Sequence, residues 1–117
     1  ALVDLDIAGE FLQLVSARIE VAQEGLGVAA RRDGIVFVAD TYNNKIKRLG
    51  TESRTVATLA GTGSAGNDDG PRLAATFYEP GGVSATEAYI YVADTNNHSI
   101  RVIDLETEAV RTLTIDF

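Results

Sequence analysis

An all-β fold, built from two repeated units of four antiparallel strands, is predicted by three observations on the sequence. Residues 38–44, Val-Ala-Asp-Thr-Tyr-Asn-Asn, return as residues 92–98, Val-Ala-Asp-Thr-Asn-Asn-His, an offset of 54 positions that relates Val38 to Val92. Each copy contains the end of a continuous apolar, β-branched and aromatic run, which is typical of a buried strand. Apart from a turn over residues 71–77, no segment shows helical periodicity. A fixed period indicates a repeat architecture.

The individual strands follow from the alternation of such runs with turn-forming residues. The run at 35–39 ends at an Asp-Thr pair and an Asn-rich stretch, whose side chains bond nearby backbone and favour turns. In the first unit we expect strands at residues 27–31, 35–39, 45–49 and 55–60, with a turn at 50–53. In the second we expect strands at residues 82–85, 89–93, 99–104 and 109–115, with a turn at 105–107.

Each unit is predicted to be an antiparallel meander of strands a, b, c and d. In such a meander the b–c turn and the connection from d to the next unit lie at the same end of the sheet. Strands that are buried on both faces are unusual in a lone antiparallel sheet. They are needed where sheets stack face to face around an axis, so the predicted elements are β-propeller blades.

The linker and second unit also resemble a known family. Residues 56–63 (VATLAGTG), 66–71 (GNDDGP), 74–77 (AATF), 80–83 (PGGV) and 89–101 (YIYVADTNNHSIR) are together similar to one long-form NHL repeat. The Asn-His of the family name stands at Asn97-His98, with Ile100 in place of the leucine, and the first copy has Asn44 where the histidine would be. The resemblance covers about residues 25–117 and is closest to NHL propellers that follow a thioredoxin-like domain in larger proteins. It implies propeller blades and a binding module.

The chain is accordingly divided into four segments. We expect an N-terminal extension at 1–24, as a partial blade or covering strands, a first NHL blade at 25–60, a Gly- and Asp-rich inter-blade loop at 61–80, and a second NHL blade at 81–117. Within the extension, residues 2–7 and 11–15 are candidates for extra strands.

Composition excludes several classes of partner. The net charge of −7 and the scattered basic residues argue against nucleic acid. No apolar run is long enough to cross a membrane, and no signal peptide is visible. With no cysteine there is no disulfide or thiolate metal site. The lack of cysteine and of a visible signal peptide together favour a cytoplasmic location.

The candidate binding residues lie in the two b–c turns and the inter-blade loop, which share one end of the blades. Polar side chains on loops held by a rigid scaffold are suited to recognition of a protein or small ligand. The candidates are Tyr42, Asn43, Asn44, Asn67, Asp68, Asp69, Asn96, Asn97 and His98. Tyr78, at the end of the linker, is either an aromatic anchor or packed between blades.

Four repeated residues are assigned to structure instead. Asp40-Thr41 and Asp94-Thr95 end equivalent strands, and a feature that every blade repeats suggests a role that every blade needs. We expect each carboxylate to accept backbone N–H groups of the following turn. No catalytic residue is assigned.

Neither a cofactor nor a metal is predicted. Residues 61–66 fit G-x-G-x-x-G, but the turn sequence and acidic residues that follow cannot open a dinucleotide-binding helix. Asn67, Asp68 and Asp69 lack the alternate spacing and closing glutamate of a calcium loop. His98 is the chain's one histidine and has no further His or Cys partner.

Two blades are too few to close a propeller, since a closed propeller has roughly four to eight blades. We expect self-association, most simply three chains closing a six-bladed ring; a longer parent propeller, or a covering role for residues 1–24, stays open. The favoured function is a non-enzymatic binding module. One alternative is that the chain forms part of a metal-dependent propeller enzyme, either a lyase or a hydrolase of lactones or esters, with its site at the central channel. A further alternative is RNA binding, which the excess of acidic residues disfavours.

Overall fold

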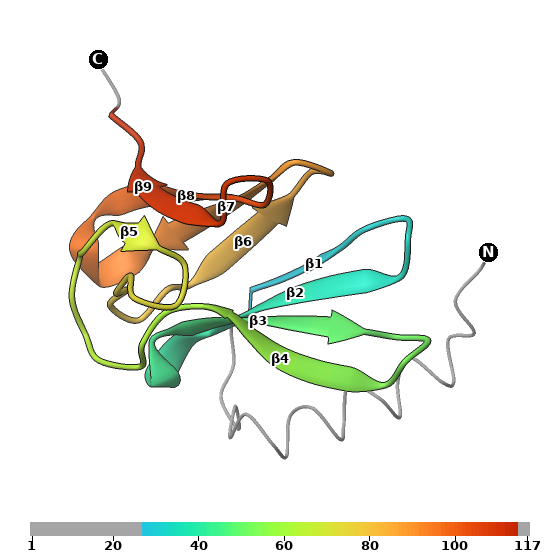
Figure 1. Cartoon of the computed structure of the whole chain (residues 1–117). Helices are drawn as coiled ribbons and strands as arrows, with labels where there is room; N and C mark the ends of the chain where they lie inside the picture. Colours follow the sequence, from blue (N-terminus) through green and yellow to red (C-terminus); the bar gives the residue numbers. More distant parts are fainter. Residues whose placement is uncertain (1–26, 115–117) are drawn as a thin grey trace.

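Two antiparallel sheets stack against each other in the computed structural model, which describes residues 27–114 (Figure 1). The predicted extra strands at 2–7 and 11–15, and the whole segment 1–24, lie outside the described residues. The first sheet has the strand order β1-β2-β3-β4, and the second has the order β5-β9-β8-β7-β6. Each sheet is a propeller blade, and the all-β fold class predicted from the sequence is confirmed.

The first blade is a four-stranded meander of neighbouring strands. Its strands are β1 (Val28–Ala30), β2 (Ile35–Asp40), β3 (Lys45–Gly50) and β4 (Thr55–Ala60), and a short 3₁₀ turn, η1 (Thr41–Asn43), joins β2 to β3. All three pairings are antiparallel, with a register shift in β3–β4 between Ile46 and Lys47. The β-branched and aromatic run of β2 lies centrally, where both of its edges are paired.

The second blade repeats this meander and adds one strand. Its strands are β6 (Gly82–Ala85), β7 (Tyr89–Asp94), β8 (Ser99–Asp104) and β9 (Ala109–Thr112), with the 3₁₀ turn η2 (Thr95–Asn97) between β7 and β8. The extra strand β5 (Gly70–Pro71) belongs to the linker and pairs with the outer edge of β9. The sequence did not predict β5, because a two-residue strand containing proline has no periodicity to detect. The last strand was predicted over residues 109–115, whereas β9 ends at Thr112.

The hydrophobic core lies between the two blades. From the first blade Phe37, Ile46 and Leu59 enter it, and from the second Ile90, Val92, Ile103 and Val110 do so. Phe77 of the linker is also fully buried there. The sheets therefore stabilise each other mainly by face-to-face burial of alternate side chains.

Close approach of the innermost strands requires glycine at one position. A Cβ atom built on Gly27 would lie 2.5 Å from the Cα atom of Gly82, which precludes any side chain there without movement of the backbone. Gly82 itself begins β6. The two blades are thus closest where β1 and β6 begin, and they splay apart toward their outer strands (Figure 1).

The outer face of the second blade corresponds to the inner face of the first. Phe37 pairs with Arg48 across β2–β3, and the equivalent pair in the second blade is Tyr91 with Val102. Phe37 is completely buried by the second blade, whereas 36% of Tyr91 is exposed. Within residues 27–114, no further sheet covers the outer face of the second blade in the way that the second blade covers Phe37.

Candidate functional site: the turn surface

The two 3₁₀ turns and the linker 61–80 come together at one end of the blades, and we call this region the turn surface. Each turn ends with a residue in the left-handed conformation, Asn44 at φ 55° and His98 at φ 52°. Asparagine, aspartate and histidine adopt this conformation more readily than other residues with side chains. The repeated Asn and His positions are thereby explained by backbone geometry.

Hydrogen bonds from the first turn fasten the linker to the first blade. The hydroxyl of Thr41 donates to the carbonyl oxygen of Pro80 at 2.8 Å. The Asn44 side chain donates from Nδ2 to the carbonyl of Gly63 at 3.2 Å and accepts at Oδ1 from the Glu79 N–H at 2.8 Å. Asn44 therefore bridges the start and the end of the linker.

The second turn makes the matching contacts on its own blade. Asn97 Nδ2 donates to the carbonyl of Gly66 and to Asp94 Oδ2, both at 2.7 Å. Asn96 donates through its side chain to Glu79 Oε2 at 2.7 Å and through its backbone to the Tyr78 carbonyl at 3.2 Å. Glu79 thus joins the two turns, and the sequence offered no sign of its role.

The repeated aspartates hold the turns through side-chain donors. Asn43 Nδ2 lies 3.2 Å from both Asp40 oxygens, as Asn97 does from Asp94 at 2.7 Å. We expected backbone N–H groups of the turns as the donors, but neither carboxylate caps its turn. Asp94 instead accepts the backbone N–H of Tyr78, a linker residue, at 2.9 Å.

A buried guanidinium lies behind the second turn. Arg101 on β8 is fully buried; its Nη1 donates to Asp94 Oδ2 at 2.9 Å and to the Thr76 carbonyl at 2.7 Å. Its Nη2 donates to the Asp68 carbonyl and to Asp69 Oδ1, both at 2.8 Å. We call Arg101 with these partners the arginine clamp, because it ties the linker to β7 and β8.

Further contacts complete the clamp. The Arg101 guanidinium carbon lies 5.0 Å from the centre of the Phe77 ring, a cation–π arrangement. Among the described residues, Arg101 Nε is the one buried side-chain polar atom without a hydrogen-bond partner. Sequence reasoning missed Arg101; the signal available was a basic residue at the same place in both repeats, Lys47 and Arg101.

Asp69, one of the candidate binding residues, takes part in the arginine clamp. Its carboxylate accepts the Thr112 hydroxyl at 2.9 Å and the Thr112 N–H at 3.1 Å, in addition to Arg101. Partial desolvation raises the pKa of Asp69, but the hydrogen bonds from Thr112 and Arg101 outweigh it and hold the pKa below its usual 3.8. Asp68 contributes its carbonyl to the clamp.

The remaining predicted binding residues are exposed. Tyr42 is 59% exposed and Tyr78 is 42% exposed, and Asn67, Asn96 and His98 are exposed as well. No group of three His, Cys, Asp or Glu side chains placed to hold a metal ion occurs within residues 27–114. The same part of the chain contains no helix long and apolar enough to span a bilayer.

Comparison with known proteins identifies the family. No family model matches, but the chain is 45% identical over 100 residues to NHL repeat-containing protein 2 of Bos taurus, and 42% identical over 116 residues to that of Gallus gallus. These alignments cover 82% and 96% of the chain. The chain belongs to the NHL-repeat family. It is also 49% identical, over 84 residues and 71% of its length, to SUPPRESSOR OF QUENCHING 1, chloroplastic, of Arabidopsis thaliana.

This NHL chain spans only 8% to 15% of the length of these three relatives. A solved structure, an auxiliary nutrient binding protein from Bacteroides thetaiotaomicron, shares its fold with a TM-score of 0.63 at 18% identity. That alignment covers 76% of this chain and 25% of the other. The likeness supports the blade architecture and no more.

Removal of the clamp's cation tests its contribution to stability. We expect Arg101→Leu to lower the free energy of unfolding by about 3–5 kcal/mol, because Asp94 would remain buried beside unsatisfied carbonyl groups. Lys47→Leu is the matched control at the equivalent place in the first blade. Lys47 is only partly buried and its Nζ donates to Thr58 Oγ1, so the expected loss is about 1 kcal/mol or less. Urea unfolding provides the measurement, and equal losses in the two variants would contradict the role of the clamp.

Proposed function

We propose that the two NHL blades act as a non-enzymatic binding module, and that the turn surface contacts a protein partner or a small ligand. The observation that carries the proposal is the combination of exposed tyrosines with a cross-linked backbone. Tyr42 and Tyr78 are exposed, while their neighbours Thr41, Asn44 and Asp94 are fixed to the linker by hydrogen bonds.

Such an arrangement favours recognition for two reasons. Tyrosine supplies a large contact area at a small cost in side-chain entropy, and it is common among the residues that dominate binding energy. A surface whose turns are already ordered loses little further freedom on binding. Exposed Asn96 and His98 add hydrogen-bonding groups on the same surface.

Peptide selection provides a direct test. Twelve-residue peptides selected by phage display against the chain are expected to bind the turn surface, and the double variant Tyr42→Ala/Tyr78→Ala should weaken them by at least about tenfold. Tyr91→Ala, which removes an exposed ring from a different face, is the matched control. Affinities by calorimetry decide the matter: peptides that bind the double variant as tightly as the unaltered chain would refute the proposal.

We also propose that the open face of the second blade receives a further blade. This face carries Tyr89 and Tyr91, whose ring centres lie 6.2 Å apart with the ring planes tilted by 47°, together with Ile100 and the buried Val102. Of their counterparts in the first blade, Phe37 and Ile46 are completely buried in the core between the blades. When the chain is alone, a second copy is the available source of such a surface, as in a ring of three chains; in a longer polypeptide the next blade would serve.

Solution mass tests self-association. The 12.4 kDa chain is expected to form oligomers at high concentration in analytical ultracentrifugation, and Tyr91→Glu should shift the distribution to monomer by placing a charge on the face. Thr107→Glu, in an exposed turn, serves as the control for added charge. A monomer throughout the concentration series would exclude self-association and leave a further blade in the same polypeptide as the remaining source.

A further inference from the structure

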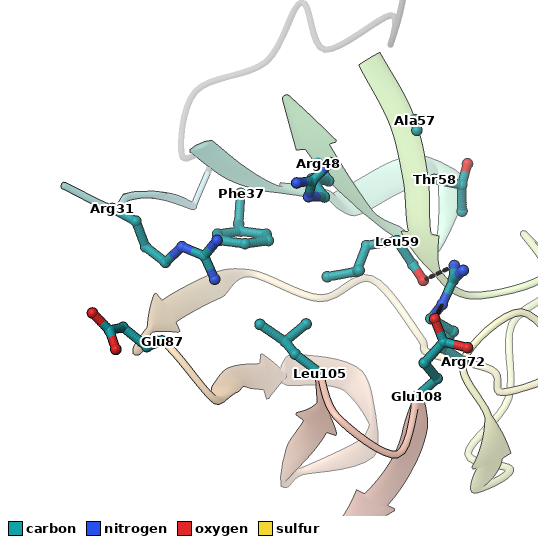
Figure 2. Close-up of a pocket in the computed structure, with 10 residues that line it drawn as sticks. All are labelled: Arg31, Phe37, Arg48, Ala57, Thr58, Leu59, Arg72, Glu87, Leu105 and Glu108. Carbon is teal, nitrogen blue, oxygen red and sulfur yellow. Dashed lines mark hydrogen bonds and ion pairs between the residues drawn. The ribbon is translucent and has the colours of Figure 1, made fainter. Parts of the chain in front are cut away.

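The first blade has a second face, turned away from the second blade, which we call its outer face. The pairings Val36–Leu49 across β2–β3 and Leu49–Val56 across β3–β4 place these side chains on the outer face, together with Val38. The alternate residues form the inner face, where Phe37 points into the groove between the blades, toward the second blade (Figure 2). The centre of the outer face is therefore aliphatic.

The central residues of the outer face are excluded from water. Leu49 is 0% exposed and Val38 is 2% exposed, as little as their counterparts Ile103 and Val92 in the core between the blades. Neighbours within one sheet shield the flanks of a side chain but not its tip, which stands away from the sheet. Within residues 27–114, the second blade and the core residues of the linker pack on the inner face, so they do not account for this burial. The burial requires a cover from elsewhere in the chain.

Two other sources of a cover are excluded. Residues 115–117 follow the second blade, and three residues extend at most about 11 Å. A second copy of the chain is not needed, because the burial is that of a single chain. Residues 1–26 remain as the source.

A buried carboxylate at the end of the outer face indicates where the cover begins. Asp40 is 1% exposed, comparable with Asp94 at 0% in the second blade. There the linker supplies the Tyr78 backbone N–H to Asp94 at 2.9 Å, four positions before Gly82. A buried carboxylate requires hydrogen-bond donors, and the repeat indicates that a segment in the same place supplies one to Asp40.

The described part of the chain begins beside this carboxylate. The Gly27 carbonyl oxygen accepts the N–H of Ala39, the residue before Asp40, at 2.8 Å. Gly27 corresponds to Gly82, since the strands that follow both residues pair in the same register. Gln23 stands four positions before Gly27, and four residues extend to about 14 Å, which is enough to bring its backbone to Asp40.

Residues 15–21 have the sequence pattern that a cover over a sheet needs. Apolar and polar residues alternate strictly, with Val15, Ala17, Ile19 and Val21 on one side of the alternation and Ser16, Arg18 and Glu20 on the other. A period of two presents one apolar side to a packed face and one polar side to water.

The second repeat provides a template for this cover. There the linker residues Ala75 and Phe77, seven and five positions before β6, are completely buried in the core. Ile19 and Val21 stand eight and six positions before Gly27, so the same spacing of two apolar residues occurs ahead of the first blade, displaced by one position. The segment ahead of β1 is thus suited to the place that the linker fills ahead of β6.

We propose that residues 15–23 dock on the outer face of the first blade in the same chain. Ile19 and Val21 contact Val38 and Leu49, and the Gln23 backbone N–H donates to Asp40. The docked segment makes the two ends of the chain unequal, because a ring of three chains has to displace it, whereas the open face of the second blade stays available. This docking does not depend on the proposed binding function of the turn surface.

Paramagnetic relaxation in NMR tests the proposal on the full chain, which has no cysteine and can be labelled at a single introduced one. A nitroxide at Glu20→Cys, on the polar side of the segment, should remove far more intensity from the amide signals of Val36 and Leu49 than from those of Tyr91 and Val102. The latter pair lies one sheet further away. A nitroxide at Arg111→Cys, on the open face of the second blade opposite Val102, is the matched control and should reverse the order.

Two further samples identify what covers the face. Val21→Asp, added to the Glu20→Cys chain, should restore the signals of Val36 and Leu49, because a charge on the apolar side opposes docking. Ser16→Asp adds the same charge on the polar side and should leave the signals weak. Equal loss in both blades of the Glu20→Cys chain, or loss that appears only when labelled chains are mixed with unlabelled isotope-enriched ones, would overturn the proposal. The first result would mean that the segment has no fixed place, and the second that another copy supplies the cover.

Discussion

The buried guanidinium of Arg101 is the interaction on which the arrangement of the linker depends. A charged group without exposure to water requires compensation on every side, and Arg101 obtains it from two carboxylates, two carbonyl groups and the Phe77 ring. Three of its hydrogen-bond acceptors belong to the linker, which has only short strand pairing of its own. The clamp therefore fixes the linker, and the linker in turn positions Tyr78 and Glu79 beside the second turn.

Much of the fold could be predicted from the sequence because it depends on local patterns. The runs around Phe37 and Ile90 identified the central strands, and the offset of 54 positions identified the two blades. The turns were also predictable, since Asn44 and His98 occupy positions that favour the left-handed conformation. These features follow from short sequence patterns and from their repetition, without knowledge of which distant residues come into contact.

The clamp could not be predicted in the same way. Arg101 meets Asp69 and Thr76 across more than twenty positions in the sequence, and such contacts have no periodic signal. The donors to Asp94 were misassigned for the same reason, because Tyr78 comes from the linker and Asn97 acts through its side chain.

Hydrogen exchange of backbone amides, measured by NMR in the chain and in Arg101→Lys, tests the clamp most directly. Lysine keeps the charge but cannot make the divergent bonds of a guanidinium. The amides of Gly66, Asp68 and Tyr78, which bond within the linker or to Asp94, should lose at least about tenfold in protection. Those of β2 and β3 in the first blade should change little. Unchanged protection in the linker, or an equal loss in both blades, would contradict the dependence of the linker on Arg101.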